Sequence, residues 1–314
     1  MSAYRALAPA KVNLGLFVGP RRDSDGRHEL VTVMQSISLA DELTLAPAPA
    51  GGAGEDVIVC EGVPGPPSEN LAATALRAFR AATGWDAPAQ QLSITKRIPV
   101  AAGLAGGSAD AAATLRLARA ASGLGDDALL AAIAAELGAD VPAALRPGRW
   151  LARGAGEELE PLPAPRSQLG VLVLPLAHEL STAAVYAEAD RAGVRRSRGE
   201  LAELHSEIAS ALGRGAALPA ATELLHNDLQ RPAVSLCPEI AEALSGARRT
   251  GAELSVVSGS GPTALGLFAP PGLALNGGPG PAAPAAEMLA GRVPAAIAAM
   301  PVDEAFGEPV ALAG

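Results

Sequence analysis

Apolar and polar residues alternate near the start of this chain of 314 residues, which predicts a strand that begins a hairpin. Every second residue from 12 to 18 is apolar, so these side chains share one face, whereas Lys11 and Asn13 point together from the other face. Residues 20–26 are rich in turn formers, and strand character resumes over 29–39. The Lys11–Asn13 pair has two interpretations here: a lysine and an amide that reach one ligand, or an ordinary exposed strand face.

The same patterns predict strands and helices along the rest of the chain. Strands are expected over residues 56–60, 92–98, 169–176, 253–257 and 264–268, and helices over 70–84, 126–137, 182–192, 199–212, 220–229 and 238–249. This mixture predicts an α+β protein. The charged, proline-rich stretch around 158–166 predicts a boundary between two domains, 1–158 and 159–314. Residues 270–284 are rich in Pro, Gly and Ala, which predicts a flexible surface loop.

Composition and charge narrow the classes of function. With 49% hydrophobic and 18% charged residues, the chain has the composition of a globular protein with a sizeable core. It has neither an uncharged apolar run of about 18 residues nor a basic-then-apolar N-terminus, so we expect a cytoplasmic protein with no membrane partner. A net charge of −9 argues against nucleic acid as a partner.

Cysteine and histidine residues show no metal or disulfide pattern along the chain. Cys60 and Cys237 are too few for a disulfide framework and lack the spacing of metal ligands, so we expect both to be small buried residues. The four histidines form no H-x-x-x-H pair, so a zinc site is not expected.

A glycine-rich segment follows the strand predicted over 92–98. Residues 99–109 read P-V-A-A-G-L-A-G-G-S-A and lead into an alanine-rich helix, with Ser108 as the expected N-cap and Asp110 as an acid in the first turn. A strand, a glycine-rich loop and a helix N-terminus together favour phosphate binding. The segment matches neither a P-loop nor a dinucleotide fingerprint, and a glycine-rich turn without a ligand remains the alternative.

Two lysines and one aspartate are candidates for chemistry. Only Lys11 and Lys96 among the 24 basic residues are lysine, and both lie in or beside the segments already described. Lys96 shares an apolar face with its strand neighbours, so it needs an anionic partner. Asp140 stands in G-A-D-V-P, where it either caps the short segment 141–145 or acts in catalysis.

Residues 99–109 resemble the central phosphate-binding motif of the GHMP kinases. P-A-K-V-N-L at 9–14 and S-G-S-G-P-T at 258–263 support the resemblance. Within that superfamily the chain is most similar to the branch of the non-mevalonate isoprenoid pathway that acts on a cytidine diphosphate-linked polyol. The segments that carry this finer resemblance are D-G-R-H-E-L at 25–30, Ser181-Thr182, G-A-D-V-P at 138–142 and Asn227-Asp228-Leu229. The matching segments spread from residue 9 to about residue 268.

The resemblance implies a two-domain GHMP kinase fold, with an N-terminal α/β domain that holds the phosphate loop and a C-terminal ferredoxin-like domain. It leaves open whether the extreme C-terminus returns to the first domain. It implies an ATP- and Mg²⁺-dependent kinase for a small-molecule alcohol, as a monomer or homodimer. The alternatives are another GHMP kinase, acting on homoserine, mevalonate or a sugar, or a non-catalytic nucleotide-binding protein. Intact Lys11 and Asp140 argue against the last.

The resemblance also implies roles for individual residues. Asp140 would be the general base, and Lys11 would keep it ionised and stabilise the developing negative charge. Ser108 would help to bind the metal. Contacts with ATP would come from Lys96, Pro99, Val100, Ala101, Ala102, Gly103, Leu104, Ala105, Gly106, Gly107, Ser108 and Ala109, and contacts with the second substrate from Asn13, Arg27, His28, Thr182 and Tyr186.

Three residues depart from the family pattern. Ala105 stands where glycine is usual, Ala109 where a serine is common, and Arg27 where a tyrosine is usual. A guanidinium stacks on planar rings, so Arg27 could still cover one face of the cytosine while Tyr186 covers the other.

Overall fold

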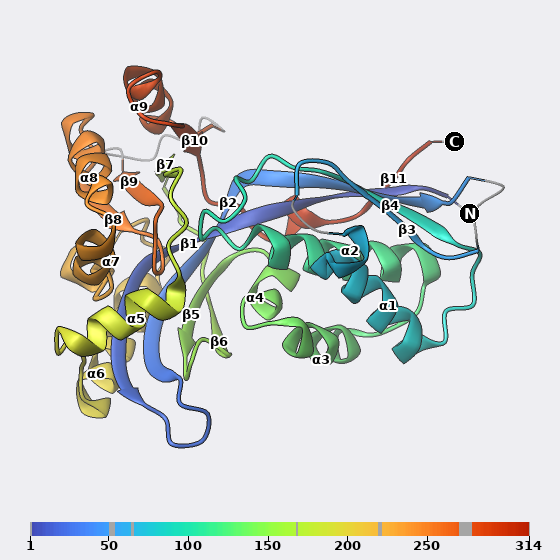
Figure 1. Cartoon of the computed structure of the whole chain (residues 1–314), viewed down its shortest axis with the longest axis horizontal. Coiled ribbons are helices and arrows are strands. Elements are labelled where there is room, and N and C mark those ends of the chain that lie inside the picture. The colour runs from blue at the N-terminus through green and yellow to red at the C-terminus, as the bar shows by residue number, and fades with distance from the viewer. Residues whose placement is uncertain are drawn as a thin grey trace.

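The computed structural model describes residues 2–49, 54–63, 66–167, 169–218, 222–269 and 278–313. These residues form a seven-stranded and a four-stranded sheet, each with its own helices. Figure 1 shows the larger sheet extending to the right above α1–α4, and the smaller sheet on the left beside α5–α9. The predicted two-domain α+β fold is confirmed. No helix in the described residues is long and apolar enough to cross a membrane.

The predicted hairpin is present and is much longer than the alternation indicated. β1 (Tyr4–Arg21) pairs antiparallel with β2 (His28–Pro47) along almost its whole length. The register shifts between Pro9 and Lys11 and again between Asn13 and Gly15. Such irregularities bend a strand and increase its twist, so β1 can continue from one half of the molecule into the other.

The larger sheet has the order β11-β1-β2-β4-β3, with β5 attached to β2 and β6 to β5. Its other strands are β3 (Val57–Cys60), β4 (Gln90–Thr95), β5 (Arg149–Arg153), β6 (Glu158–Leu162) and β11 (Val310–Ala311). Its helices are α1 (Leu71–Thr83), α2 (Gly106–Ser122), α3 (Asp127–Leu137) and α4 (Val141–Leu145). β6 therefore extends this sheet past residue 158, and β11 brings the end of the chain back to it.

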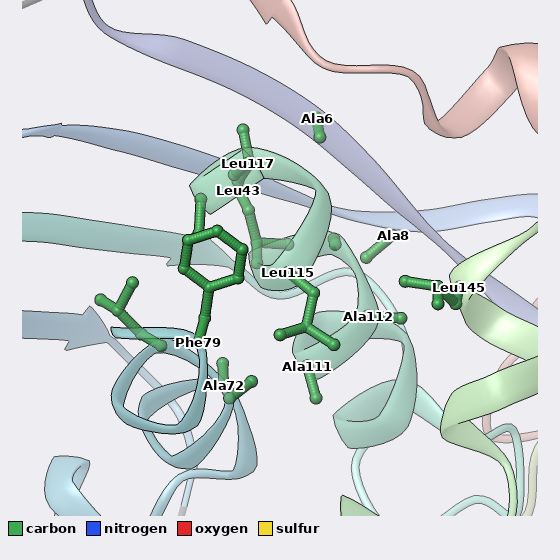
Figure 2. Packing of buried hydrophobic residues seen from close by; sticks show 14 of the residues in the cluster. Ala6, Ala8, Leu43, Ala72, Phe79, Ala111, Ala112, Leu115, Leu117 and Leu145 are labelled. Atoms are coloured by element: carbon green, nitrogen blue, oxygen red, sulfur yellow. The ribbon is translucent and has the colours of Figure 1, made fainter. Parts of the chain in front are cut away.

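Small side chains on α2 allow it to pack closely under this sheet. Ala111, Ala112 and Leu115 of α2 lie in one buried cluster with Phe79 of α1 and with Ala6 and Ala8 of β1 (Figure 2). Burial of these apolar surfaces is the main stabilising contribution in this half. The alanine-rich composition of α2 is thus a packing requirement, since larger residues would push the helix away from Ala8 and its neighbours on β1.

The smaller sheet is antiparallel throughout, with the order β10-β7-β9-β8. Its strands are β7 (Gly170–Leu174), β8 (Leu254–Val257), β9 (Ala264–Phe268) and β10 (Ile297–Ala299). Its helices are α5 (Thr182–Arg191), α6 (Arg198–Leu212), α7 (Gln230–Leu236), α8 (Glu239–Arg249) and α9 (Ala282–Leu289). Three 3₁₀ turns, at Pro67–Glu69, Thr222–Leu225 and Glu304–Gly307, complete the described elements.

Three predicted elements differ from the structure. The helix predicted over 220–229 is wrong: residues 222–225 form a 3₁₀ turn, and Asn227 then pairs as an isolated bridge with Leu16, because backbone pairing with β1 competes with helix formation. The strand predicted over 92–98 ends at Thr95. In the predicted loop 270–284, residues 270–277 lie outside the described residues, and α9 already begins at Ala282.

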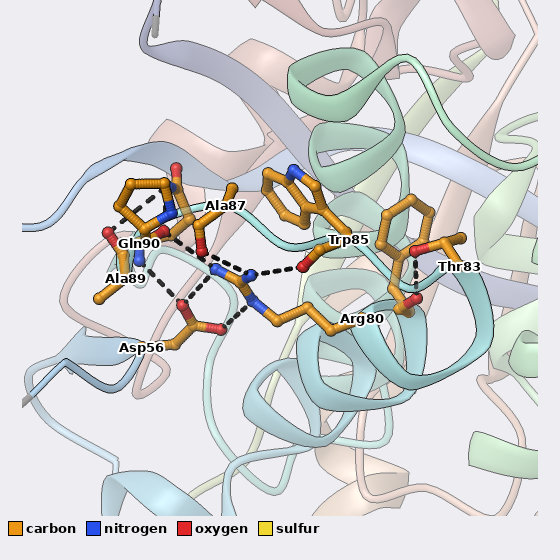
Figure 3. A network of polar contacts seen from close by, with 9 residues as sticks. Asp56, Arg80, Thr83, Trp85, Ala87, Ala89 and Gln90 are labelled. Atoms are coloured by element: carbon orange, nitrogen blue, oxygen red, sulfur yellow. Dashed lines mark hydrogen bonds and ion pairs between the residues drawn. The ribbon is translucent and has the colours of Figure 1, made fainter.

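Arg80 of α1 connects the residue before β3 with the loop that follows the helix. Its guanidinium pairs with Asp56, and it also donates to the carbonyls of Trp85 and Ala87 (Figure 3). The Trp85 ring lies against the same guanidinium, 4.6 Å from it. One side chain therefore orders the turn that leads into β4, the strand directly before the glycine-rich loop.

Arg116 of α2 is buried and forms no ion pair with any carboxylate among the described residues. Its five-donor guanidinium is satisfied by backbone carbonyls of four separate residues at 2.7–3.1 Å, namely Leu7, Ala144, Leu145 and Gly307. Burial lowers the pKa of Arg116 to about 10. This residue joins β1, α4 and the C-terminal 3₁₀ turn to one helix.

We expect Arg116→Met to lower the free energy of unfolding by about 3 kcal/mol, because it leaves several buried carbonyls without donors. Urea unfolding followed by circular dichroism measures the change. The control is Arg119→Met on the same helix, where an exposed pair with Asp127 is lost and the expected cost is below about 1 kcal/mol. Equal losses in the two variants would contradict the assigned role of Arg116.

Candidate active site

The glycine-rich loop connects β4 to α2 and ends in a left-handed residue. Ala105, with φ of 56°, is the N-cap of α2, and its side chain makes no capping hydrogen bond. Ser108 therefore lies within the first helical turn, so the prediction that it caps the helix is wrong, and Asp110 lies beyond that turn. The sharp turn at Ala105 starts the helix earlier than the polar side chains indicate. Glycine adopts this conformation without the ~1–2 kcal/mol that an L-residue pays, which explains its usual presence there.

Free amide groups face outward at the start of α2. The first helical hydrogen bond runs from Ala109 N to Ala105 O, at 2.9 Å. The N–H groups of Gly106, Gly107 and Ser108 precede it and have no acceptor within the helix. These donors and the helix dipole together favour an anion at this point.

A pocket of about 490 Å³ lies against the loop. Residues 99–107 line it from one side, and Cys60, Asn70 and Leu71 line it from β3 and the start of α1. Its volume suits a ligand the size of a nucleotide. Of the predicted ATP contacts, only Ser108 and Ala109 do not line this pocket.

Lys96 also lines the pocket, and it has the anionic partners that its sequence position required. Its ammonium group is 2.7 Å from Asp110 Oδ2 and forms a second ion pair with Asp41. Asp41 is fully buried and also accepts hydrogen bonds from the N–H groups of Arg97 and Ile98. The sequence analysis missed Asp41, although two adjacent carboxylates, Asp41 and Glu42, in an otherwise apolar segment were the available signal.

Asp110 and Asp41 differ in how completely their carboxylate oxygens are hydrogen-bonded. Asp110 is almost completely buried, and its Oδ1 has no hydrogen-bond partner among the described residues. The pKa of Asp110 is raised to about 7, because burial and the nearby Asp41 outweigh the opposing effect of Lys96. Burial also tends to lower the pKa of Lys96, but attraction to Asp110 and Asp41 outweighs this effect and raises it. Lys96 is therefore a fixed cation beside the loop.

Lys11, Asn13 and Asp140 meet at a second point of the site. Lys11 Nζ lies 3.4 Å from Asp140 Oδ1 and donates to Asn13 Oδ1 at 3.0 Å, so the two strand residues do point together. Asp140 makes no capping hydrogen bond to α4, and its carboxylate is 40% exposed. The capping interpretation therefore has no support. The N–H of Lys11 donates to Leu104 O at 3.1 Å, which connects this group to the glycine-rich loop.

A turn of the smaller sheet, residues 258–263, closes against the loop. Thr263 donates its hydroxyl to Ala102 O at 2.6 Å. Gly103 has φ of 74°, and a Cβ there would lie only 2.7 Å from Gly261 O. The backbones of the two halves thus approach so closely that no side chain fits between them.

Asn13 and Asn227 hold this turn in place from the other side. The N–H of Asn13 donates to Ser258 Oγ at 3.1 Å, and Asn227 donates its amide to the carbonyls of Val257 and Gly259, both at 2.7 Å. The sequence analysis singled out Asn227 only through its motif, and its contacts show that it orders the turn.

The predicted substrate residues His28 and Tyr186 stack on each other. Their ring centroids are 5.0 Å apart with an interplanar angle of 23°. His28 Nε2 lies 2.9 Å from Asp190 Oδ1, and the Arg21 guanidinium donates to Asp190 Oδ2. Asp190, one helical turn after Tyr186 on α5, was not identified from the sequence; its i+4 spacing from an aromatic candidate was the available signal.

Arg27 and Asp140 lie within electrostatic reach of Tyr186. The pKa of Tyr186 is raised to about 12, because burial and the nearby Asp140 outweigh the opposing effect of Arg27. Arg27 donates to Ala155 O at 2.8 Å. The aromatic pair and the Lys11–Asp140 pair therefore belong to the same region.

Thr182 and Ser108 are the two remaining residues that the resemblance assigned to the site. The Thr182 hydroxyl is 2.9 Å from that of Ser260, which brings α5 to the turn that closes on the phosphate loop. The Ser108 hydroxyl has no hydrogen-bond partner among the described residues.

Both halves of the chain match family models. Residues 70–148 match GHMP kinases N terminal domain, and residues 199–276 match GHMP kinases C terminal. The first match contains the glycine-rich loop and Asp140.

Curated relatives are similar over most of the chain. A 4-diphosphocytidyl-2-C-methyl-D-erythritol kinase of Kineococcus radiotolerans is 43% identical over 284 residues, which cover 87% of this chain and 84% of that protein. A protein of the same name from Corynebacterium glutamicum (strain R) is 42% identical over 271 residues, covering 83% and 84%.

Solved structures agree with these relatives. The crystal structure of a 4-(cytidine 5'-diphospho)-2C-methyl-D-erythritol kinase has a TM-score of 0.74 and 35% identity, and the match covers 94% of this chain and 98% of that one. A homoserine kinase from Cytophaga hutchinsonii has a TM-score of 0.72 at 15% identity, covering 99% and 98%, and so shows the fold alone. The chain therefore belongs to the GHMP kinases and, within them, to the 4-diphosphocytidyl-2-C-methyl-D-erythritol kinase family.

Proposed function

We propose that the protein transfers the γ-phosphoryl group of ATP to the 2-hydroxyl of 4-diphosphocytidyl-2-C-methyl-D-erythritol, in the non-mevalonate isoprenoid pathway. The observation that carries this proposal is the accessible Lys11–Asp140 pair, whose strand is hydrogen-bonded to the phosphate loop through Leu104. A base and a cation thus lie beside the place where phosphate oxygens are favoured. The printed names of the similar proteins supply the identity of the alcohol.

The loop would hold the triphosphate of ATP. The free amides of residues 106–108 donate to phosphate oxygens, and Lys96 adds a positive charge beside them. Mg²⁺ suits this arrangement when most of its ligands are phosphate oxygens and water, because such a site needs few protein ligands. The uncommitted Ser108 hydroxyl is the oxygen that the chain offers for it. When bound, the ion neutralises charge on the transferring group.

Asp140 would accept the proton of the attacking hydroxyl. The new bond forms between the substrate 2-oxygen and the γ-phosphorus, the bond from that phosphorus to ADP breaks, and the proton passes to the carboxylate. Lys11, whose ammonium group is 3.4 Å from Asp140, stabilises the negative charge that develops on the attacking oxygen. Asn13 holds the lysine at 3.0 Å, so the cation needs no reorganisation during the reaction.

His28 and Tyr186 would recognise the cytosine. Asp190 would determine whether His28 donates or accepts a hydrogen bond at the edge of the base. The pKa of Asp190 is lowered: burial alone would raise it, but its bonds to His28 and Arg21 outweigh burial. An ionised carboxylate only accepts hydrogen bonds, so Nε2 of His28 carries the hydrogen and Nδ1 of the neutral ring is an acceptor. Nδ1 has no partner among the described residues, and cytosine offers an amino group where uracil has an oxygen.

Arg27 would lie near the same base. Its position beside Tyr186 fits a guanidinium that covers the second face of the cytosine, while its bond to Ala155 O orients it.

The reaction itself is tested by ADP release from ATP and Mg²⁺ with a panel of alcohols: 4-diphosphocytidyl-2-C-methylerythritol, homoserine, mevalonate and galactose. We expect turnover with the first alone, and a new phosphomonoester at its 2-oxygen by ³¹P NMR. Turnover only with one of the other alcohols would overturn the proposed substrate, and no turnover with any of them would overturn the proposed activity.

We expect Asp140→Asn to lower kcat by roughly 100-fold or more with little change in KM, because it removes the proton acceptor and keeps the shape. Lys11→Arg should be nearly as impaired as Lys11→Ala, since a planar guanidinium does not fit the place of a compact ammonium. Steady-state kinetics measure both, with Asp127→Asn at the exposed start of α3 as the control. Near-normal turnover of Asp140→Asn would show that Asp140 is only an ion-pair partner of Lys11 and not the general base.

Asp190→Asn should reverse the hydrogen-bonding preference of His28. The Arg21 guanidinium needs an acceptor, so the amide introduced at position 190 turns its oxygen toward Arg21 and its N–H₂ group toward His28 Nε2. Nε2 must then accept, so the ring hydrogen of His28 moves to Nδ1. We expect kcat/KM for the cytidine substrate to fall by about 10- to 100-fold, mostly through KM, while the value for the uridine analogue does not fall. Glu188→Gln on the same helix is the control. Equal losses for both substrates would show that Asp190 has only a structural role.

A further inference from the structure

Three potential metal ligands meet on the smaller half, and none of them has a role assigned above. His178 lies in the segment after β7, Cys237 follows α7, and Glu239 is the first residue of α8. Cys237 Sγ is 3.4 Å from Glu239 Oε2, and His178 Nε2 is 3.5 Å from Glu239 Oε1. All three donor atoms lie within 4.8 Å of one another.

These distances match those around a tetrahedral zinc ion. With metal–ligand bonds of about 2.0–2.3 Å, donor atoms around such an ion are about 3.4–3.6 Å apart. Two of the three pairs already have this separation. The third pair, Cys237 with His178, can close by a side-chain rotation, because the His178 side chain is half exposed.

The backbone holds two of the three donors in a short turn. The N–H of Cys237 donates to Ala233 O at 2.9 Å, and its carbonyl accepts from the N–H of Ile240 at 3.2 Å. Cys237 is nearly buried, so its sulfur has little freedom to turn away from Glu239. The donors are therefore largely positioned before any ion arrives, which reduces the entropic cost of binding.

We propose that His178, Cys237 and Glu239 form a binding site for a borderline-soft divalent cation, with Zn²⁺ as the best match. A thiolate, an imidazole and a carboxylate suit Zn²⁺, whereas Mg²⁺ and Ca²⁺ prefer oxygen ligands alone. Three protein ligands leave a fourth position open, which a water molecule or Glu242 completes. Glu242 lines a pocket of about 300 Å³ together with His178 and Glu239. Arg249 and Arg292 line the same pocket and bring positive charge, so the carboxylates are needed to balance it.

A bound ion would join the α7–α8 turn to the segment that leads into α5. Ile240 and Leu180 both lie close to Gly261, in the turn that contacts the phosphate loop. The expected consequence is a raised melting temperature of the intact protein in the presence of Zn²⁺, because the ion binds the folded chain.

Titration of the purified full-length chain with Co²⁺ tests the site directly. We expect one equivalent to bind, with a near-ultraviolet sulfur-to-cobalt charge-transfer band and the visible bands of tetrahedral Co²⁺, and Zn²⁺ to displace it. Cys237→Ser should abolish the charge-transfer band. His178→Gln and Glu239→Gln, at half-exposed positions that the fold tolerates, should weaken binding by at least 10-fold.

The second cysteine provides the matched control. Cys60→Ser should leave the charge-transfer band and the stoichiometry unchanged. The proposal is overturned if no thiolate band forms, if the band survives Cys237→Ser, if it depends on Cys60, or if Zn²⁺ leaves the melting temperature unchanged. The alcohol panel with Mg²⁺ does not involve these residues, so failure of the metal site and failure of the proposed kinase activity are distinguishable.

Discussion

The antiparallel pairing of β1 with β2 is the constraint on which the rest of the structure depends. β1 contributes Ala8 to the core between the larger sheet and its helices, Val12 to the core between the halves, and Val18 to the core of the smaller half. One continuous strand thus passes through three separate cores. Because a strand advances about 3.3 Å per residue, the pairing also sets the spacing of Lys11 and Asn13 along the site. The hairpin end places His28 farther along the same pair of strands.

The two lysines of the chain are held in different ways. Lys96 is shared by Asp41 and Asp110, both buried, so its position is set before any nucleotide arrives. Lys11 faces the half-exposed Asp140 and is held by Asn13. A partly buried lysine that is paired with two carboxylates is costly to move and gives the glycine-rich loop a fixed electrostatic environment. Lys11, in contrast, is paired with a carboxylate that is exposed to solvent.

The approach of the smaller sheet to the glycine-rich loop explains why the site lies between the halves. Thr263 bonds to Ala102, and Gly103 leaves no space for a side chain beside Gly261. Asn227 orders the same turn through two backbone carbonyls. The loop is therefore supported by both halves, and a change in the turn would alter the shape of the loop as well as the packing of α5.

The sequence by itself determined the elements whose signals are local. Alternation predicted the start of β1 and the direction shared by Lys11 and Asn13, and Asn70 and Gly84 marked the ends of α1. The glycine-rich motif predicted the loop and, through its resemblance, the family. Only the tertiary structure decided that residues 222–229 do not form a helix, that Asp41 pairs with Lys96, that Asp190 holds His28, and that Cys237 meets His178. Each of these depends on contacts between residues far apart in the chain, and such contacts leave no periodic or local trace in the sequence.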